Sequence, residues 1–279
     1  MFSSLLAIPR DFARHRYLIR QLSWRDIVGR YRGSLIGLLW SFITPFVLLA
    51  IYTMVFGVIF KSRWTGTAPQ GGDGLAVGDS RSDFAMILFA GLILHGFLSE
   101  TMTRSTGLVL GNTNLVKRVL FPLPVLAWTV VLPALFHAAI GFLILMGLYV
   151  GTHGLPPPTA LLLPVVMAPM IVLAAGIVWF LSALGVFVRD IAQAMPPLTT
   201  ILMFLSPIVF PLSAIPEGLR DWVFLNPLTI PVENVRAVLI WGHAPDWTQL
   251  AAYAAVALAA AWFGSYWFRR SQPAFADVL

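Results

Sequence analysis

The sequence contains no cysteine, and only 11% of its 279 residues are charged. The absence of cysteine excludes disulfide bonds and thiolate metal sites. Soluble domains are about 25% charged, so this chain lacks the polar surface that a soluble protein of its length needs. Hydrophobic residues make up 58% of the chain, and the mean hydropathy is +0.84. The composition therefore predicts an integral membrane protein.

Motifs that would identify an enzyme are also missing. There is no G-x-x-x-x-G-K-[S/T] loop for nucleotide phosphates and no H-E-x-x-H zinc motif. We expect no catalytic residue, no metal site and no cofactor in this chain. A membrane-embedded transferase, the main rival from another class, needs acids or histidines that converge near one membrane face, and no such cluster is evident. Few acids lie in the apolar segments, so proton coupling is disfavoured and the energy for any transport must come from elsewhere.

Long uncharged segments are abundant. A helix needs about 20 apolar residues to cross a bilayer. The longest uncharged run, 119–188, is divided by GTHGLPPP at 151–158, whose glycines and prolines indicate a turn. We predict an all-α protein with a single domain, 1–279, and six crossings, at 34–60, 84–106, 125–150, 160–188, 191–212 and 247–268. Short apolar pieces broken by prolines predict re-entrant helices within 213–236.

The basic residues are distributed unevenly between the two predicted faces. Thirteen of the 18 Lys and Arg residues fall in the N-terminal segment, in 104–118, at 189 or after 268. The other five are Lys61, Arg63, Arg81, Arg220 and Arg236. Because cytoplasmic loops carry the excess of Lys and Arg, both termini are predicted to be cytoplasmic. The net charge of +6 then reflects membrane topology and not a nucleic-acid partner.

Four stretches carry a family resemblance over nearly the whole chain. They are RDIVGRYRGSLIGLLWSFITPFVLLAIYTMVF (25–56), NTNLVKRVLFPLPVL (112–126), LSALGVFVRDIAQ (181–193) and SPIVFPLSAIPEGLRDWVFLNPLT (206–229). In this order they resemble the permease subunits of ABC exporters for polysaccharides. The resemblance is to the O-antigen (Wzm-like) type, with capsule and teichoic-acid permeases as related families.

The resemblance implies partners and a substrate. It implies a homodimer of this chain bound to two copies of a separate ABC ATPase, which would hold ATP and Mg. It also implies export of a lipid-linked glycan, carried on undecaprenyl diphosphate, from the cytoplasm across a bacterial inner membrane. A permease for capsule, teichoic acid or another lipid or drug substrate remains the alternative.

Two cytoplasmic segments are candidates for contact with the ATPase. Aromatic and aliphatic residues alternate with arginines in 12–24, which predicts an amphipathic helix in contact with membrane lipids at the interface. By resemblance this helix helps to hold the ATPase, and 112–118 is a coupling segment. The candidate coupling residues are Tyr17, Arg20, Asn114, Leu115, Lys117 and Arg118. Alternatively, Lys117 and Arg118 only satisfy the charge rule for cytoplasmic loops.

Aromatic residues are frequent on the first predicted crossing. Aromatic rings stack on the apolar faces of sugars and could line a conduit for a glycan. Membrane helices also use aromatic residues for packing and for the interface belt, so both interpretations stay open. The candidate lining residues are Trp40, Phe42, Phe46, Tyr52 and Phe56.

The charged residues around this crossing have two possible roles. Arg25, Arg30 and Arg32 mark the cytoplasmic headgroup layer, and they also lie where a lipid diphosphate would enter. Gly29, Gly33 and Gly37 form a small-residue ladder that could let helices approach closely. Glu100 and Arg104, one helical turn apart, predict a structural ion pair.

The segment before the last crossing resembles the pair of short gate helices that this family has on the periplasmic side. Its carboxylates are expected to cap helices or to face water. The candidate gate residues are Pro211, Pro216, Glu217, Asn226 and Pro227.

Overall fold

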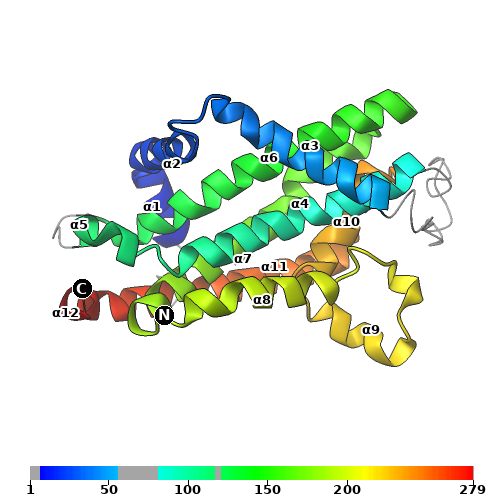
Figure 1. The fold of residues 1–279 in the computed structure, drawn as a ribbon. Coiled ribbons are helices and arrows are strands. Elements are labelled where there is room, and N and C mark those ends of the chain that lie inside the picture. Colours follow the sequence, from blue (N-terminus) through cyan, green and yellow to red (C-terminus); the bar gives the residue numbers. More distant parts are fainter. Residues whose placement is uncertain (1–6, 56–80, 117–120, 279) are drawn as a thin grey trace.

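The computed structural model describes residues 7–55, 81–116 and 121–278, and these residues form helices and connecting turns without a strand (Figure 1). The all-α fold class is thereby confirmed. The helices are α1 (Ala7–Arg14), α2 (Arg16–Arg30), α3 (Trp40–Tyr52), α4 (Arg81–Ser105), α5 (Thr113–Val116), α6 (Trp128–His153), α7 (Leu163–Phe187), α8 (Ile191–Phe204), α9 (Glu217–Phe224), α10 (Thr229–Leu239), α11 (Trp247–Ser271) and α12 (Phe275–Val278).

Five helical segments of the described chain are long and apolar enough to cross a membrane. They are Gly37–Val55, Ser82–Ser105, Leu123–His153, Pro158–Phe187 and Trp247–Ala274. Each corresponds to a predicted crossing, although only part of 34–60 is described. The first of these helical segments begins at Gly37, since 31–36 forms a turn.

The predicted crossing 191–212 is shorter than expected. Its helix, α8, has 14 residues and stops at Phe204. At 1.5 Å per residue this is about 21 Å, less than the hydrocarbon core of about 30 Å. Pro207 and Pro211 cannot donate to a helical hydrogen bond, which explains why the helix does not continue. The count of six full-length crossings is therefore not confirmed.

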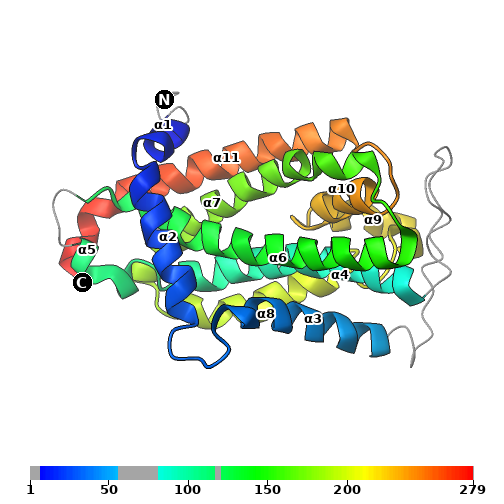
Figure 2. The ribbon, with the colours of Figure 1, turned by 90° about the horizontal axis from the view of Figure 1, so that it is seen from above.

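Helix α2 lies across the end of the bundle that also carries α5 and α12 (Figure 2). Ile19, Ser23 and Ile27 lie one turn apart on α2 and are buried. The Ser23 hydroxyl donates to the Trp128 carbonyl at 3.3 Å, so this face of α2 rests on the start of α6. Helix α2 differs from the interface helix predicted at 12–24. It begins at Arg16, after the separate helix α1, and it continues to Arg30.

The predicted glycine ladder is wrong. Gly33 and Gly37 have φ angles of +88° and +58°, which belong to a turn and not to a helix. No atom would lie within 4 Å of a Cβ added at Gly29, Gly33 or Gly37. Gly33 and Gly37 let the chain change direction between α2 and α3, Gly29 lies within α2, and among the described residues none of the three brings helices together.

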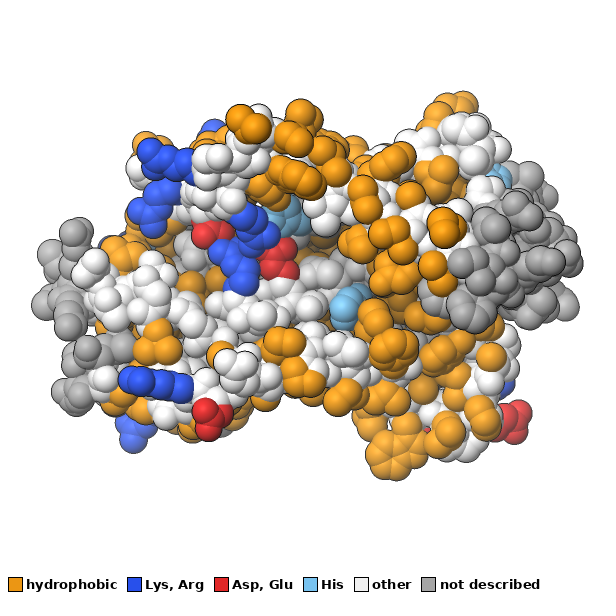
Figure 3. All heavy atoms as spheres, viewed as in Figure 1, with side chains coloured by type: hydrophobic (Ala, Val, Ile, Leu, Met, Phe, Trp, Pro, Cys, Tyr) orange, Lys and Arg blue, Asp and Glu red, His pale blue; other side chains and the backbone are white. Residues whose placement is uncertain are grey.

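Most basic side chains lie toward one end of the molecule. In Figure 3 most of the Lys and Arg side chains of this face lie toward the end that carries α1, α2 and α12, with apolar side chains covering much of the rest. Arg236 is an exception among the basic residues, because it lies on α10 and has no exposed surface. The sequence analysis counted it among external loop residues, and that placement is wrong.

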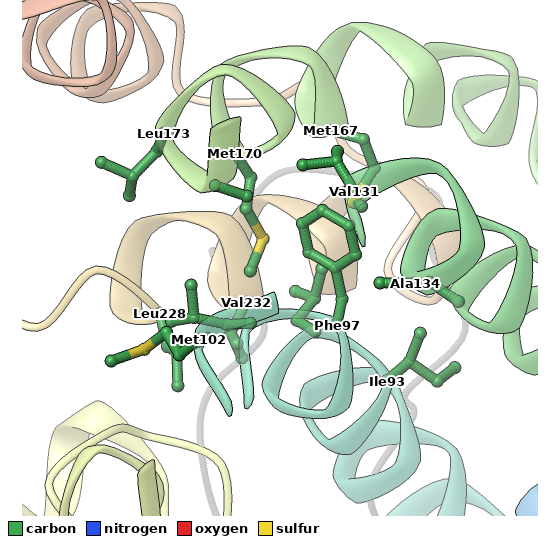
Figure 4. Packing of buried hydrophobic residues seen from close by; sticks show 14 of the residues in the cluster. Ile93, Phe97, Met102, Val131, Ala134, Met167, Met170, Leu173, Leu228 and Val232 are labelled. Carbon is green, nitrogen blue, oxygen red and sulfur yellow. The ribbon is translucent and has the colours of Figure 1, made fainter. Parts of the chain in front are cut away.

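Helix α4 runs through the middle of the bundle, with α3 at its margin. In the most apolar part of the α4 span 72% of residues are buried, compared with 11% in the α3 span. Figure 4 shows Phe97 of α4 facing Val131 and Ala134 of α6 and Met167 of α7. Most of the surface of α3 is therefore left uncovered by the other described helices.

Helices α7 and α11 pack with their backbones in contact. A Cβ added at Gly264 would overlap the Gly176 carbonyl oxygen, and one added at Gly176 would lie 2.7 Å from the Ala260 carbonyl. Small residues permit this approach, which is common between membrane helices.

Candidate functional site

Three helices meet in a group of charged and polar side chains at the α1–α2 end of the bundle. We call it the charge cluster. Its members are Asp26 and Arg30 of α2, Tyr31 directly after α2, Glu100 and Arg104 of α4, and His137 of α6. Ionisable groups in membrane helices are expensive unless paired, so their clustering marks a candidate functional site.

Glu100 is the centre of the charge cluster. Its Oε1 accepts from Nη2 of Arg30 at 2.6 Å, and its Oε2 lies 2.9 Å from Nδ1 of His137. The predicted partner, Arg104, is present at 3.4 Å but is the most distant of the three. The carboxylate thus connects α2, α4 and α6, and does more than the local pairing within one helix that the sequence suggested.

Two further contacts tie α2 to the bundle. Nη2 of Arg104 lies 2.5 Å from Oδ2 of Asp26. The Tyr31 hydroxyl lies 3.1 Å from Nε2 of His137. Asp26 and Tyr31 were missed by the sequence analysis, because their partners lie 78 and 106 residues away along the chain.

Arg25 and Arg30, two of the three arginines proposed for a lipid diphosphate, do not point to one place. Arg30 is paired with Glu100, while Arg25 borders a separate cavity of about 200 Å³. Five residues apart on one helix, Arg25 and Arg30 point about 140° away from each other. Arg32 is exposed in the turn that follows α2. Within the described part of the chain, neither Arg25 nor Arg32 makes an ion pair.

A cavity of about 280 Å³ lies beside the charge cluster. Its walls come from α3, α4, α6 and α8, and Glu100, His137 and His95 supply its polar groups. His95 Nε2 lies 3.0 Å from the Thr199 carbonyl, which links α4 to α8. His95 was not predicted, although a histidine inside an apolar segment is itself a signal.

The candidate aromatic residues fall into two groups. Tyr52 lines the cavity. Trp40, Phe42 and Phe46 do not, and their exposed fractions are 43%, 41% and 62%. The Trp40 indole donates to the Ser34 hydroxyl at 3.1 Å and so braces the turn before α3. Phe56 lies outside the described residues.

A comparison with known families decides the class of the chain. Residues 17–240 match the ABC-2 type transporter family. The chain belongs to this family. The match spans most of the sequence and includes every helix from α2 to α10.

Relatives of this ABC-2 permease are curated as transport proteins. The O-antigen export system permease protein RfbA of Myxococcus xanthus is 25% identical over 279 residues, which cover 99% of this chain and 100% of that protein. The polysialic acid transport protein KpsM of Escherichia coli is 24% identical over 264 residues, covering 94% and 96% of the two chains. The O-antigen export system permease protein RfbA of Klebsiella pneumoniae is 20% identical over 220 residues, or 78% of each chain.

Those candidate coupling residues of the permease that the structure describes lie at the same end as the charge cluster. Tyr17 and Arg20 line an open cleft of about 660 Å³ between α2 and α6. Leu115 of the short helix α5 borders the cavity that also contains Arg25. Asn114 lies beside Leu115 in α5, whereas Lys117 and Arg118 are outside the described residues.

The candidate gate residues surround α9. Pro216 precedes this helix and Glu217 is its exposed first residue, while Pro211 lies before the turn that leads to it. Asn226 is buried and structural, because its amide donates to the Leu202 carbonyl at 2.7 Å and accepts from the Leu228 N–H at 3.0 Å. The Pro227 carbonyl accepts from the Tyr253 hydroxyl at 3.0 Å.

Arg236 is buried and stabilises the segment after α8 through hydrogen bonds. Its guanidinium donates to the carbonyls of Ile87, Pro207 and Ile208 at 3.0, 2.6 and 3.0 Å, and it pairs with Glu233 at 2.9 Å. It thereby joins α4 and α10 to the broken backbone after α8. The sequence analysis missed this role because the partners of Arg236 are mostly backbone carbonyls.

Proposed function

We propose that this chain is the transmembrane subunit of an ATP-driven exporter that moves a lipid-linked polysaccharide from the cytoplasm to the periplasm. It would work as a homodimer with two copies of an ABC ATPase subunit, which bind ATP and Mg. Both termini would face the cytoplasm of a bacterial inner membrane. The polyprenyl diphosphate of the substrate would enter near Arg25, Arg30 and Arg32.

One observation carries the proposal. The similarity to a curated O-antigen export permease extends over 99% of this chain and 100% of that relative. The absence of a phosphate-binding loop in the sequence is consistent with an ATPase on a separate subunit. The concentration of Lys and Arg at one end supports the proposed orientation.

A capsule-type glycan is the second candidate. It is favoured by the similarity to KpsM, a polysialic acid transport protein, over 94% of this chain. O-antigen and capsule differ in where the glycan is finally attached, so surface analysis separates the two.

Deletion of the gene tests the proposal. The expected result is loss of one surface polysaccharide, with its lipid-linked form accumulating inside the cell, because synthesis continues when export stops. Immunoblots of lipopolysaccharide and of capsule, together with extraction of lipid-linked glycan, measure both changes. Unchanged surface glycans and no intracellular accumulation would contradict the proposal.

A pair of substitutions on α3 tests the glycan path. Tyr52→Ala removes an aromatic ring from the cavity wall and is expected to reduce export at least about fivefold, taking the lower end of the about 1–3 kcal/mol that one aromatic side chain contributes by stacking on a nucleic-acid base. Phe46→Ala removes an exposed ring that does not line the cavity, and export should stay within about twofold of wild type. Surface glycan per unit of membrane-inserted protein is the measurement. Equal effects of the two changes would argue against a conduit at the cavity.

A further inference from the structure

Arg30 differs from the other arginines of α2 in having an internal carboxylate as its partner. The Arg30 side chain is 36% exposed, whereas the Glu100 side chain is 17% exposed. The salt bridge uses Nη2, and Nη1 lies 3.3 Å from His137 Nδ1. Arg32 lies two residues further on, exposed and without an ion pair in the described ranges. A paired arginine and an exposed arginine are therefore two residues apart in the sequence where α2 passes into the turn before α3.

We propose that Glu100 competes with an anionic lipid headgroup for Arg30, and that headgroup binding releases the turn between α2 and α3. The ligand class is a polyprenyl diphosphate, so this inference rests on the proposed function. In the structure the Glu100 carboxylate is paired with Arg30. When the diphosphate arrives, it takes the place of Glu100 on Arg30 and is also bound by Arg32.

The exchange leaves no buried charge without a partner. Once separated from Arg30, Glu100 keeps His137 at 2.9 Å and Arg104 at 3.4 Å. An unpaired buried carboxylate would oppose the exchange strongly, but this one has spare partners. A partly exposed ion pair is weak, and the guanidinium fork matches phosphate oxygens as well as it matches a carboxylate.

The exchange has a structural consequence at the cavity. Glu100 and His137 line the cavity, and so do Thr44, Pro45 and Tyr52 of α3. The Arg30–Glu100 and Tyr31–His137 contacts hold the turn against this end of the cavity. Gly33 and Gly37 give that turn a backbone that can reorient. Meanwhile Asp26–Arg104 and Ser23–Trp128 keep the rest of α2 in place. Headgroup binding would remove one of the two contacts that hold the turn, and would so loosen the turn and the start of α3 without detaching α2.

Binding measurements on the full chain in phosphatidylcholine nanodiscs test this competition, with undecaprenyl diphosphate as the probe. Glu100→Gln removes the competing charge and is expected to lower the apparent Kd about fivefold to tenfold, because the binding-competent population rises. Arg30→Gln should raise the Kd at least about tenfold, and the double variant should match Arg30→Gln alone. Asp190→Asn is the control, since it removes a negative charge at an exposed position between α7 and α8 that contacts none of these arginines.

Several outcomes would overturn the competition. An unchanged Kd in Glu100→Gln would do so. An equal decrease of the Kd in Asp190→Asn would also do so, because the effect would then come from the general loss of negative charge. An equal gain for dioleoyl phosphatidylglycerol would show a general phospholipid site and would contradict the polyprenyl diphosphate as the ligand. If Glu100→Gln folds poorly, Glu100→Asp withdraws the carboxylate from Arg30 while keeping its charge, and it should tighten binding as well.

The same samples separate this inference from the proposed function. If wild type binds undecaprenyl diphosphate and exports glycan while Glu100→Gln changes nothing, only the competition is wrong. If wild type does not bind the diphosphate lipid at all, both the competition and the proposed substrate are wrong.

Discussion

Replacing Arg236 by leucine is expected to lower the free energy of unfolding by about 3 kcal/mol or more, the usual cost of removing one partner from a buried charged network. Three carbonyls, those of Ile87, Pro207 and Ile208, lose a donor. The last two belong to a segment where helical hydrogen bonding has ended, so no backbone N–H is positioned to replace the guanidinium. Thermal unfolding of the purified protein in detergent, followed by size-exclusion chromatography, measures the loss.

Arg220 provides the matched control for this prediction. Its Nε donates to a single carbonyl, that of Ile215, at 3.2 Å, and the side chain is partly exposed. Arg220→Leu is therefore expected to cost less than about 1 kcal/mol, as water can replace its one bond. If the Arg236 and Arg220 variants unfolded at the same temperature, the assigned role of Arg236 would be incorrect.

The second large effect is expected from Gly264→Ala. The added methyl group would overlap the Gly176 carbonyl, so α7 and α11 must separate along their closest contact. Overpacking of this kind typically costs about 1–3 kcal/mol. The separation also weakens the packing between α7 and α11 around Ala260 and Ala261. A decrease in thermal stability and in the yield of folded protein is the expected measurement.

Gly147→Ala separates overpacking from the general effect of replacing a glycine. Gly147 lies in the last third of α6, and no described atom is within 4 Å of an added Cβ. Alanine stabilises a helix by about 1 kcal/mol relative to glycine, so Gly147→Ala should be as stable as wild type or slightly more stable. Equal destabilisation by the two alanines would contradict the close approach of α7 and α11.

The long apolar segments could be located from the sequence because their length and composition alone determine that they enter a bilayer. The turn at 151–158 was also predictable, and α6 ends at His153 within it. Predictions failed where local pattern and backbone geometry disagree. Gly33 and Gly37 have helical spacing, but their positive φ angles form a turn. The segment 191–212 has the composition of a crossing, but its helix ends at Phe204.

The candidate site was only partly visible in the sequence. Arg30, Glu100 and Arg104 were singled out, yet as members of two separate features. That Arg30 and Glu100 form one pair could not be inferred, because 70 residues separate them and no local periodicity relates them. Asp26, Tyr31 and His95 gave weak signals, since single polar residues near a membrane helix have many possible partners.

By itself, the sequence determined that this protein resides in a membrane, where its apolar segments lie and which end carries the basic residues. These properties follow from composition and charge, which act on each segment independently. Only the tertiary structure decided that α2 lies across α6 and that Glu100 of α4 lies within reach of Arg30 and His137. The physical reason is that ion pairs between distant segments depend on how the helices pack, and that packing is a property of the whole bundle.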